Sequence, residues 1–421
     1  MPRMAPYPEE GLVPLEQARE RVLAACRPLP PREVALGSAL GLVLAEAVFS
    51  PGAVPAFENS AMDGYALRAA DTQVVPAKLR VVGAVMAGGP LANLALKEGE
   101  AARIMTGAPL PAGADAVVMV EHTRSADGWV IVDEAVPAGR HVRAAGSDLQ
   151  AGDEVLPAGT PLGAPQVAAL AAVGARTVWV HPRPRVGVAS TGDELYDGPG
   201  PLPAGKVRDS NRPGLLAQLS VDGFEAVDLG TLPDDKASLA RVLTDAARCC
   251  DALLTSGGVS MGERDLVKVV LAELGPGNAC SLKVAVRPAK PLAFSTLGER
   301  AVPAFGLPGN PVSAFVSYEL FARPALRAMA GRSRLGRPQL RAVLEAPLPR
   351  QRDGKLHLAR VALWRGPDGR PRARPSGGQG SHQLSALAHA SALALVPDGE
   401  GLAAGDEVDV WVLDSDALAA G

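Results

Sequence analysis

The hydrophobic positions near the start of the chain recur at the spacing of an amphipathic helix, which we predict over residues 12–26. The apolar stripe of this helix consists of Leu15, Ala18, Val22 and Ala25. From about residue 55 to residue 142 the pattern changes to short β-type runs, such as KLRVVGAVMAG and GWVIVDEAV, which glycine and proline separate. Such runs predict a small all-β or mixed domain.

A regular alternation of apolar runs and amphipathic stretches begins at Arg185. Strands are predicted at VGVAST, FEAVDLGTL, DALLTSGGVS and AVPAFGL, and helices over residues 212–221, 235–249 and 265–274, with a long helix after GLPGNP. Strands that alternate with helices predict a parallel, doubly wound sheet. From about Pro338 the pattern returns to β-type runs, including LRAVLEAPL and EVDVWVL, which predict a small C-terminal β domain.

Composition narrows the classes of protein that fit this pattern. The 421 residues are 47% hydrophobic, so the chain can bury several cores, and its length predicts roughly two to four domains. The net charge of −3 argues against nonspecific nucleic-acid binding, which needs a basic face. No run of 18 apolar residues predicts a membrane span, and MPRMAPYPEE lacks the apolar region of a signal peptide. We therefore expect a cytoplasmic protein without nucleic-acid or membrane partners, whose four cysteines are reduced.

Three loops rich in glycine and hydroxyl residues follow predicted strands of the α/β region. In an open parallel sheet, ligands bind beyond the carboxyl ends of the strands, where glycine-rich loops expose backbone N–H groups to anions. Hydroxyl side chains add further donors. The loops together predict a site for a phosphorylated ligand, although each one alone could be an ordinary tight turn. Their candidate binding residues are Ser190, Thr191, Gly192, Ser256, Gly257, Gly258, Ser260, Pro308, Gly309, Asn310 and Pro311.

Carboxylates stand near these loops, where a phosphate would tolerate them only with a bridging cation. Glu194, Asp234 and Asp265 offer hard oxygen ligands, so together with phosphate they predict a Mg²⁺ site. For Asp234 and its neighbour Asp235, N-capping of the following helix is the alternative. No GxGxxG motif follows the first strand and no GxxxxGK[ST] motif occurs, which argues against a dinucleotide oxidoreductase and a P-loop ATPase.

The segment SLKVAVRPAKPLAF contains three basic residues, Lys283, Arg287 and Lys290. On a strand, Lys283 and Arg287 would share a face, from which they could neutralise a phosphate or another oxyanion. A solvated strand edge is the alternative. In the β-rich region, ENSAMDGYA contains Asp63 and RIMTGAPLPAGADAVVMVE contains Thr106. Taken alone, both of these segments predict only turns.

Six segments follow one another in a fixed order: ENSAMDGYA, RIMTGAPLPAGADAVVMVE, RAAGSDLQAGDEVL, GVASTGDEL, TSGGVSMGERD and FGLPGNPVSAF. The set is highly specific, unlike any one of its loops. With it the chain strongly resembles the molybdopterin molybdenumtransferase (MoeA) family, which includes the gephyrin E domain. The resemblance spans nearly the whole chain and is weakest before Pro14 and after Pro338.

The resemblance implies four domains, one of them a molybdopterin-binding α/β domain with helices on both faces of a parallel-type sheet. An elongated N-terminal domain would consist of residues 1–50 and 142–181, with a β-rich domain of residues 51–141 inserted into it. The α/β domain would cover residues 182–331, and a small β-barrel-like domain residues 338–421. The resemblance also implies a homodimer, in which Asp63 on the inserted domain would serve the neighbouring subunit's substrate.

The activity implied by the resemblance is the Mg²⁺-dependent insertion of molybdate into adenylylated molybdopterin, which releases AMP and gives molybdenum cofactor. A molybdopterin adenylyltransferase would be a partner protein. Matching motifs implies catalytic roles for Asp63, Thr106, Glu194, Asp265, Lys283, Arg287 and Lys290. The implied metal residues are Glu194, Asp234 and Asp265, and the implied substrate contacts include Pro308, Pro311, Arg360 and Ser381. Arg287 departs from the family, where lysine is usual, so its charge is kept while its geometry changes.

Two other functions fit parts of the sequence. A molybdopterin adenylyltransferase would use the same α/β domain, but such proteins are single-domain and lack the ENSAMDGYA half. A non-enzymatic scaffold is the second alternative, because the gephyrin E domain also anchors a receptor. Loss of the carboxylates or of the basic segment would favour a scaffold, but Asp63, Glu194, Asp265 and Lys290 are all present.

Overall fold

The structure is a computed structural model that describes residues 11–89, 94–259, 265–275 and 279–418. The chain divides into two compact units. Unit 1 contains the residues up to 32, residues 41–43 and the residues from 180 onward, and unit 2 contains residues 33–40 and 44–179. The boundaries fall within or beside the short strands β1 (Arg32–Ala35), β2 (Val43–Leu44) and β13 (Thr177–His181). Every helix within the described ranges is too short or too polar to cross a bilayer.

The central sheet of unit 1 has six strands. In spatial order they are β17 (Glu225–Leu232), β14 (Arg185–Thr191), β18 (Ala252–Ser256), β22 (Val302–Leu307), β21 (Pro291–Leu297) and β19 (Cys280–Lys283). The first four are parallel, which confirms the predicted parallel sheet for its main part. However, β21 is antiparallel to both β22 and β19. Only a short turn joins β21 to β22, and a parallel pairing would need a crossover of about a dozen residues or more.

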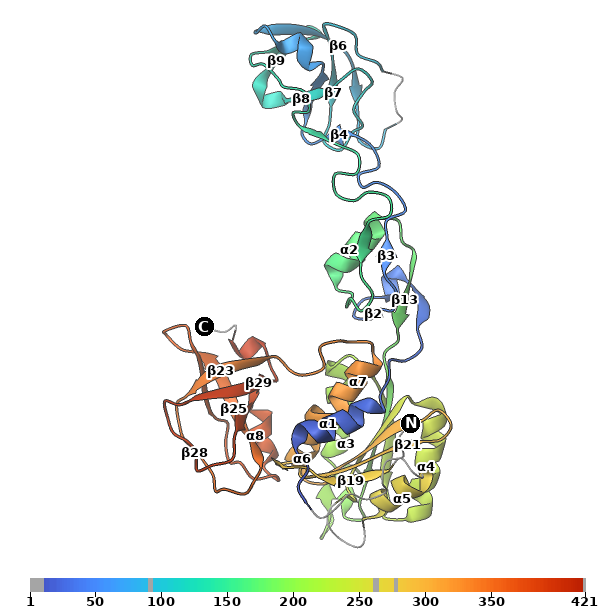
Figure 1. The fold of residues 1–421 in the computed structure, drawn as a ribbon, viewed down its shortest axis with the longest axis vertical. Helices are drawn as coiled ribbons and strands as arrows, with labels where there is room; N and C mark the ends of the chain where they lie inside the picture. Colours follow the sequence, from blue (N-terminus) through green and yellow to red (C-terminus); the bar gives the residue numbers. More distant parts are fainter. Residues whose placement is uncertain (1–10, 90–93, 260–264, 276–278, 419–421) are drawn as a thin grey trace. The chain divides into compact units, whose positions relative to one another are not determined.

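Two hydrophobic cores lie on opposite faces of this sheet, because successive residues of a strand point to opposite sides. In β14, Val188 belongs to the first core and Ala189 to the second, and in β18 Leu254 and Leu253 divide in the same way. Helices therefore cover both faces, as predicted (Figure 1). The first face carries α1 (Leu15–Ala24), α3 (Asn211–Val221), α6 (Pro311–Ser317) and α7 (Arg323–Met329), and the second carries α4 (Lys236–Cys249) and α5 (Leu266–Leu274).

Helix α1 has the predicted apolar stripe, since Leu15, Ala18 and Val22 are buried. All three residues belong to the first core of the α/β domain. The structure thus differs from the prediction that residues 1–50 form part of the elongated domain. A periodic stripe shows that a helix buries one face, but it does not specify the surface against which that face packs.

The basic segment is not one strand. Strand β19 ends at Lys283, β20 (Val286–Arg287) follows, and β21 begins at Pro291. Strand β20 leaves the central sheet and pairs with β25 (Leu356–Arg365) of the C-terminal domain. The expectation that Lys283 and Arg287 share the face of one strand is therefore wrong. Pro288 and Pro291 lack the N–H groups that a continuous ladder would need.

The C-terminal domain is the predicted β domain, and its sheet closes on itself. The strand order is β20, β25, β26 (Pro371–Pro375), β23 (Gln339–Leu344), β29 (Glu407–Val412) and β27 (Ala392–Val396), and β27 also pairs with β25. Strand β24 (Leu348–Pro349) pairs with β28 (Gly401–Leu402), and helix α8 spans Leu384–Ala388. Closure leaves the five strands from β25 to β27 without a free edge, and an apolar core fills the small barrel.

Unit 2 contains a six-stranded sheet in the region of short β-type runs. Its strand order is β8 (Ala116–Met119), β5 (Gly64–Leu67), β7 (Glu100–Ile104), β6 (Ala77–Val85), β10 (Trp129–Val132) and β9 (Thr123–Ala126). Its two faces pack against separate apolar clusters, so adjacent residues such as Tyr65 and Ala66 lie in different clusters. Unit 2 also contains the pairs β3 (Val48–Phe49) with β12 (Glu154–Leu156) and β4 (Asn59–Ser60) with β11 (Val142–Arg143), and helix α2 (Ala164–Ala172). Strands β1, β13 and β2 form a three-stranded sheet at its boundary with unit 1.

Candidate functional site

The three predicted loops come together at the carboxyl ends of β14, β18 and β22. Glycine allows this close approach: a Cβ atom on Gly257 would lie 2.3 Å from the carbonyl oxygen of Thr191, and Gly257 also has a φ of 104°. A Cβ on Gly309 would lie 3.6 Å from the Cα of Gly257. The sheet therefore brings together loops that are more than 100 residues apart in sequence, as expected for a ligand site at this edge.

These loops line a cavity of about 310 Å³, which we call the loop cavity. Its wall includes β15 (Leu195–Tyr196), β16 (Val207–Arg208) and one residue from the C-terminal domain, His382. Eight of the predicted site residues line it: Ser190, Thr191, Glu194, Ser256, Gly257, Gly309, Asn310 and Pro311. Gly192, Gly258 and Pro308 lie in the same loops outside this lining, and Ser260 lies outside the described residues.

The hydroxyl groups of the loop cavity donate their protons to other parts of the protein. Ser190 Oγ donates to Asp209 at 3.0 Å, and Thr191 Oγ1 donates to Asp234 at 3.0 Å. Ser256 Oγ donates to the carbonyl of Pro308 at 3.4 Å. A hydroxyl has only one proton, so in this structure these groups are not the anion donors that the sequence suggested.

Backbone groups remain as donors at this cavity. The N–H groups of Gly309 and Asn310 have no acceptor within the described part of the chain, and both residues line the cavity. The loop after β22 therefore offers backbone N–H groups to an anion, while the hydroxyl side chains of the other two loops hold the loops together.

Three polar residues just before and at the start of α3 were missed by the sequence reasoning. Asp209 has a side chain only 1% exposed and accepts hydrogen bonds from Ser190, Thr231 and Arg212. Arg212 in turn pairs with Asp197 and Asp228. The third residue, Asn211, lies between the loops of β18 and β22. The sequence feature that could have indicated these three residues is the polar stretch RDSNR, which leads into a predicted helix.

The candidate metal residues do not form a closed cage. Asp234 accepts hydrogen bonds from Thr191 and from the backbone of Asp193, and Asp265 pairs with Lys268 at 3.2 Å. Glu194 is exposed and lines the loop cavity. Within the described ranges, no group of three His, Cys, Asp or Glu side chains could hold a metal. Mg²⁺ usually takes one or two carboxylates together with substrate phosphates and water, so a partial set of ligands fits it.

Asp235 caps helix α4, which was the alternative to a metal role for Asp234 and Asp235. Its side chain accepts a hydrogen bond from the backbone N–H of Ser238 at 2.7 Å, at the N-terminus of α4. This bond lowers the pKa of Asp235, because it favours the charged carboxylate. Asp234 does not cap the helix and instead joins the loop after β14.

A second cavity, of about 530 Å³, lies between β20 and the C-terminal barrel, and we call it the arginine cavity. Arg287, Arg350 and Arg360 line it. Arg360 is only 1% exposed, and its guanidinium donates to the carbonyls of Gly378 at 2.9 Å and Gly380 at 3.2 Å. Its Nε has no partner, and no carboxylate of the described chain pairs with it. Burial accordingly lowers the pKa of Arg360.

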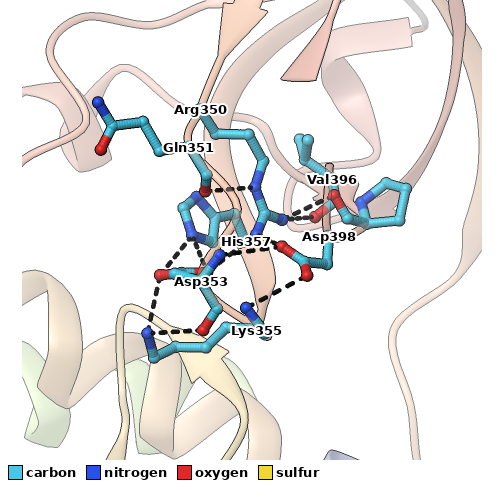
Figure 2. A network of polar contacts seen from close by, with 9 residues as sticks. Arg350, Gln351, Asp353, Lys355, His357, Val396 and Asp398 are labelled. Carbon is cyan, nitrogen blue, oxygen red and sulfur yellow. Dashed lines mark hydrogen bonds and ion pairs between the residues drawn. The ribbon is translucent and has the colours of Figure 1, made fainter. Parts of the chain in front are cut away.

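Arg350, in contrast, is completely paired. Figure 2 shows its guanidinium among the carbonyl of Val396 at 2.9 Å, Asp353 at 2.9 Å and Asp398 at 2.6 Å. Asp353 also accepts from Lys355 at 2.8 Å and lies 3.2 Å from His357 Nε2. Partial burial alone would raise the pKa of Asp353, but the hydrogen bonds from Lys355 and His357 outweigh it and lower the pKa to about 2. This network stabilises one wall of the cavity.

One short segment borders both cavities. Gly378 and Gln379 line the arginine cavity, and His382 lines the loop cavity. Gln379 holds this segment to Arg360 by accepting from the Arg360 backbone N–H at 2.8 Å and donating to its carbonyl at 3.0 Å. The carbonyl of Ser381, a predicted site residue, accepts from the N–H of Val312 at the start of α6. The two cavities are therefore neighbours.

The other basic candidates occupy different places. Lys283 is exposed at the end of β19, and Lys290 is half-buried in the turn before β21. The carbonyl of Lys290 accepts from the N–H of Val284 at 2.7 Å, which closes the loop that carries Arg287. Of the three, only Arg287 lines one of the two cavities.

In unit 2, Asp63 and Thr106 form a pair. The backbone N–H and the hydroxyl of Thr106 both donate to the same oxygen of Asp63 at 2.7 Å. The backbone bond and the hydroxyl bond lower the pKa of Asp63, which is exposed. Gly64 is required beside it, because a Cβ there would lie 1.9 Å from the carbonyl oxygen of Val118. The sequence predicted both residues but not their contact.

An open sheet with backbone donors at its carboxyl edge lies next to a barrel domain with a buried guanidinium that no carboxylate of the described residues neutralises. This arrangement is suited to a multidomain protein with anionic ligands. Comparison with known families gives this class a name. Residues 13–174 match the MoeA N-terminal region (domains I and II), residues 187–328 match the probable molybdopterin-binding domain, and residues 341–413 match the MoeA C-terminal region (domain IV).

Curated relatives and solved structures agree with these matches. The molybdopterin molybdenumtransferase of Haemophilus influenzae is 35% identical over 403 residues, which cover 95% of this chain and 98% of the relative. Molybdopterin molybdenumtransferase 2 of Mycobacterium tuberculosis is 38% identical over 94% of this chain and 99% of the relative. A MoeA protein structure from Pyrococcus horikoshii has a TM-score of 0.80 at 32% identity and covers 96% of this chain and 100% of that one. The chain therefore belongs to the molybdopterin molybdenumtransferase (MoeA) family, whose members are transferases of molybdenum cofactor biosynthesis.

Proposed function

We propose that this protein inserts molybdate into adenylylated molybdopterin, with release of AMP and formation of molybdenum cofactor. Membership of the family supports the class of reaction. The observation that carries the proposal for the oxyanion is Arg360, a buried guanidinium without a carboxylate partner within the described chain. Such a group is stabilised by an anion, and its planar donors suit a tetrahedral oxyanion.

The loop cavity would hold the phosphate part of the adenylylated substrate. Its backbone N–H groups at Gly309 and Asn310 are suited to phosphate oxygens. The arginine cavity would hold molybdate, and the segment from Gly378 to His382 would keep the two substrates side by side. Proximity of this kind lowers the entropic cost of bringing two reactants together.

The reaction calls for charge neutralisation more than for a protein nucleophile. Cleavage of a phosphoanhydride develops negative charge on phosphate oxygens, which fixed donors and cations stabilise. Mg²⁺ would be held by Glu194, which lines the cavity, and by Asp265, with Asp234 nearby, and it would supply positive charge at the phosphates. Lys283, Arg287 and Lys290 would add further positive charge.

The direct test is incubation of the purified protein with adenylylated molybdopterin, Mg²⁺ and molybdate, followed by assays for AMP and for active cofactor. We expect both products to form, and AMP release to depend on Mg²⁺. Absence of turnover under conditions in which a curated relative is active would contradict the proposal. A molybdopterin adenylyltransferase, the proposed partner, would be added separately to ask whether it accelerates substrate transfer.

We further propose a homodimer in which Asp63 and Thr106 serve the partner subunit's site. The test mixes two inactive variants, Asp63→Asn and Asp265→Asn, under conditions that exchange subunits. In a shared-site dimer, one site of each heterodimer carries both substitutions and the other carries neither, so about half of the activity per heterodimer should return. No recovery despite verified exchange would contradict the shared site: either each site is built within one chain, or Asp63 does not belong to the site.

A further inference from the structure

Asn211 connects the loops that follow β18 and β22. It is the first residue of α3, lines the loop cavity and is 7% exposed. Its Nδ2 donates to Ser256 Oγ at 2.7 Å and to the carbonyl of Gly309 at 2.7 Å. These partners lie on different loops, so one side chain fixes the distance between them.

The orientation of this amide follows from chemistry. The carbonyl of Gly309 can only accept, so the nitrogen of the amide must face it. Both amide protons are then used, one by each loop. The remaining atom, Oδ1, is buried and has no donor within the part of the chain that the structure describes. An unpaired buried acceptor is unfavourable. The side chain of Asn211 therefore keeps its two hydrogen bonds to the loops at the cost of leaving Oδ1 without a donor among the described residues.

The two loops are otherwise joined mainly through glycine backbone. The N–H of Gly257 donates to the carbonyl of Leu307 at 3.1 Å, and Ser256 Oγ donates to the carbonyl of Pro308 at 3.4 Å. Both contacts lie near the bottom of the loops, where the strands end. Asn211 adds the contact at Gly309, which stands next to the backbone donor of Asn310.

We infer that Asn211 is a positioning residue, which holds the Ser256–Gly257 loop and the Gly309–Asn310 loop at the separation that the substrate phosphate requires. This inference rests on the proposed function, because adenylylated molybdopterin is taken as the substrate. Asn211 itself does not contact the reacting atoms. It acts through the backbone groups of the two loops.

The decisive variant is Asn211→Asp, which keeps the size of the side chain but removes both donors. It also places a carboxylate oxygen against the carbonyl oxygen of Gly309, and these two acceptors repel each other. We expect KM for adenylylated molybdopterin to rise roughly 10-fold or more, with a smaller change in kcat, because misplaced binding groups weaken substrate binding first. In a double-mutant cycle with Ser256→Ala, the two effects should be less than multiplicative, since both act on one hydrogen-bonded unit.

The matched control is Ser317→Ala, which removes a buried hydroxyl that has no partner within the described residues and joins no loops. It should leave KM unchanged. A lower unfolding temperature of Asn211→Asp with an unchanged KM would make Asn211 merely structural and overturn the inference. If that variant does not fold, Asn211→Ala removes the donors without adding a charge and is measured in the same way. Failure of the unsubstituted protein to turn over would overturn the proposed function as well, whereas normal turnover with an unchanged KM overturns only this inference.

Discussion

The loop cavity and the arginine cavity use polar side chains in opposite ways. In the loop cavity, the hydroxyls of Ser190, Thr191 and Ser256 are bonded within the protein, which leaves the backbone to face a ligand. In the arginine cavity, Arg350 is fully paired, while Arg360 is buried with carbonyl partners only. The hydroxyl side chains of the first cavity therefore build its shape, whereas in the second cavity Arg287 and Arg360 supply positive charge that no carboxylate of the described residues neutralises.

Removal of the Arg360 charge should have the largest effect. A charge-assisted hydrogen bond contributes about 1.5–3 kcal/mol, so Arg360→Met should weaken the affinity for molybdate roughly 10- to 100-fold or more. The apolar replacement also fills the buried volume, so the fold should survive. The measurement is the dependence of AMP release on molybdate concentration, with Arg360→Lys as the variant that keeps the charge. An unchanged dependence in Arg360→Met would remove the contrast between the two cavities.

The next effect is expected from the candidate metal carboxylates, of which Glu194 lines the loop cavity whereas Asp265 does not. Asp265→Asn should reduce Mg²⁺-dependent AMP release roughly 10- to 100-fold, the amount typical of a disturbed metal site. Asp235→Asn is the control, because Asp235 only caps helix α4. The Mg²⁺ concentration for half-maximal rate is measured for both variants. Full activity of Asp265→Asn with the usual Mg²⁺ requirement would refute a metal role for Asp265.

The paired network of the arginine cavity should act on stability. The contacts of Asp353 lower its pKa to about 2 in the folded protein, below the ordinary 3.8, so they stabilise the fold at neutral pH. Because the folded pKa is the lower one, this stabilisation is present above pH 3.8 and is lost as the pH falls towards 2.

Urea unfolding of the protein and of Asp353→Asn between pH 2 and pH 6 measures this contribution. We expect the difference in unfolding free energy to be largest above pH 4 and to shrink at the acid end. A difference that does not change with pH would mean that Asp353 contributes through packing and not through its charge.

The smallest effect is expected for Ser190→Ala. The hydroxyl proton is already donated to Asp209, so its loss should change KM for adenylylated molybdopterin by less than about 3-fold, well below the effect of a lost charged contact. Steady-state kinetics at saturating molybdate measures this change. A rise in KM as large as that of Asn211→Asp would show that Ser190 faces the substrate, and the two cavities would then be alike.

Secondary-structure elements were predicted from the sequence more successfully than contacts between distant segments. The four parallel strands of the central sheet, the helices α3 to α5 and the three loops were predicted from residues 185–310 alone, since periodicity and glycine placement are local properties. The break in the basic segment could have been found, because Pro288 and Pro291 are visible in the sequence. The pairing of β20 with β25 could not, because it depends on two chain segments about 70 residues apart.

The sequence by itself determined the four parallel strands, the helices and the glycine-rich loops of the α/β domain, and it placed the candidate residues of these loops at the ends of strands. Only the tertiary structure decided which of those groups are committed elsewhere. Ser190 meets Asp209 across 19 residues, Asn211 meets Ser256 across 45, and Asn211 meets Gly309 across 98. The physical reason is that backbone conformation follows from neighbouring residues, whereas the partner of a hydroxyl, an amide or a guanidinium is whatever the packed chain brings within about 3 Å.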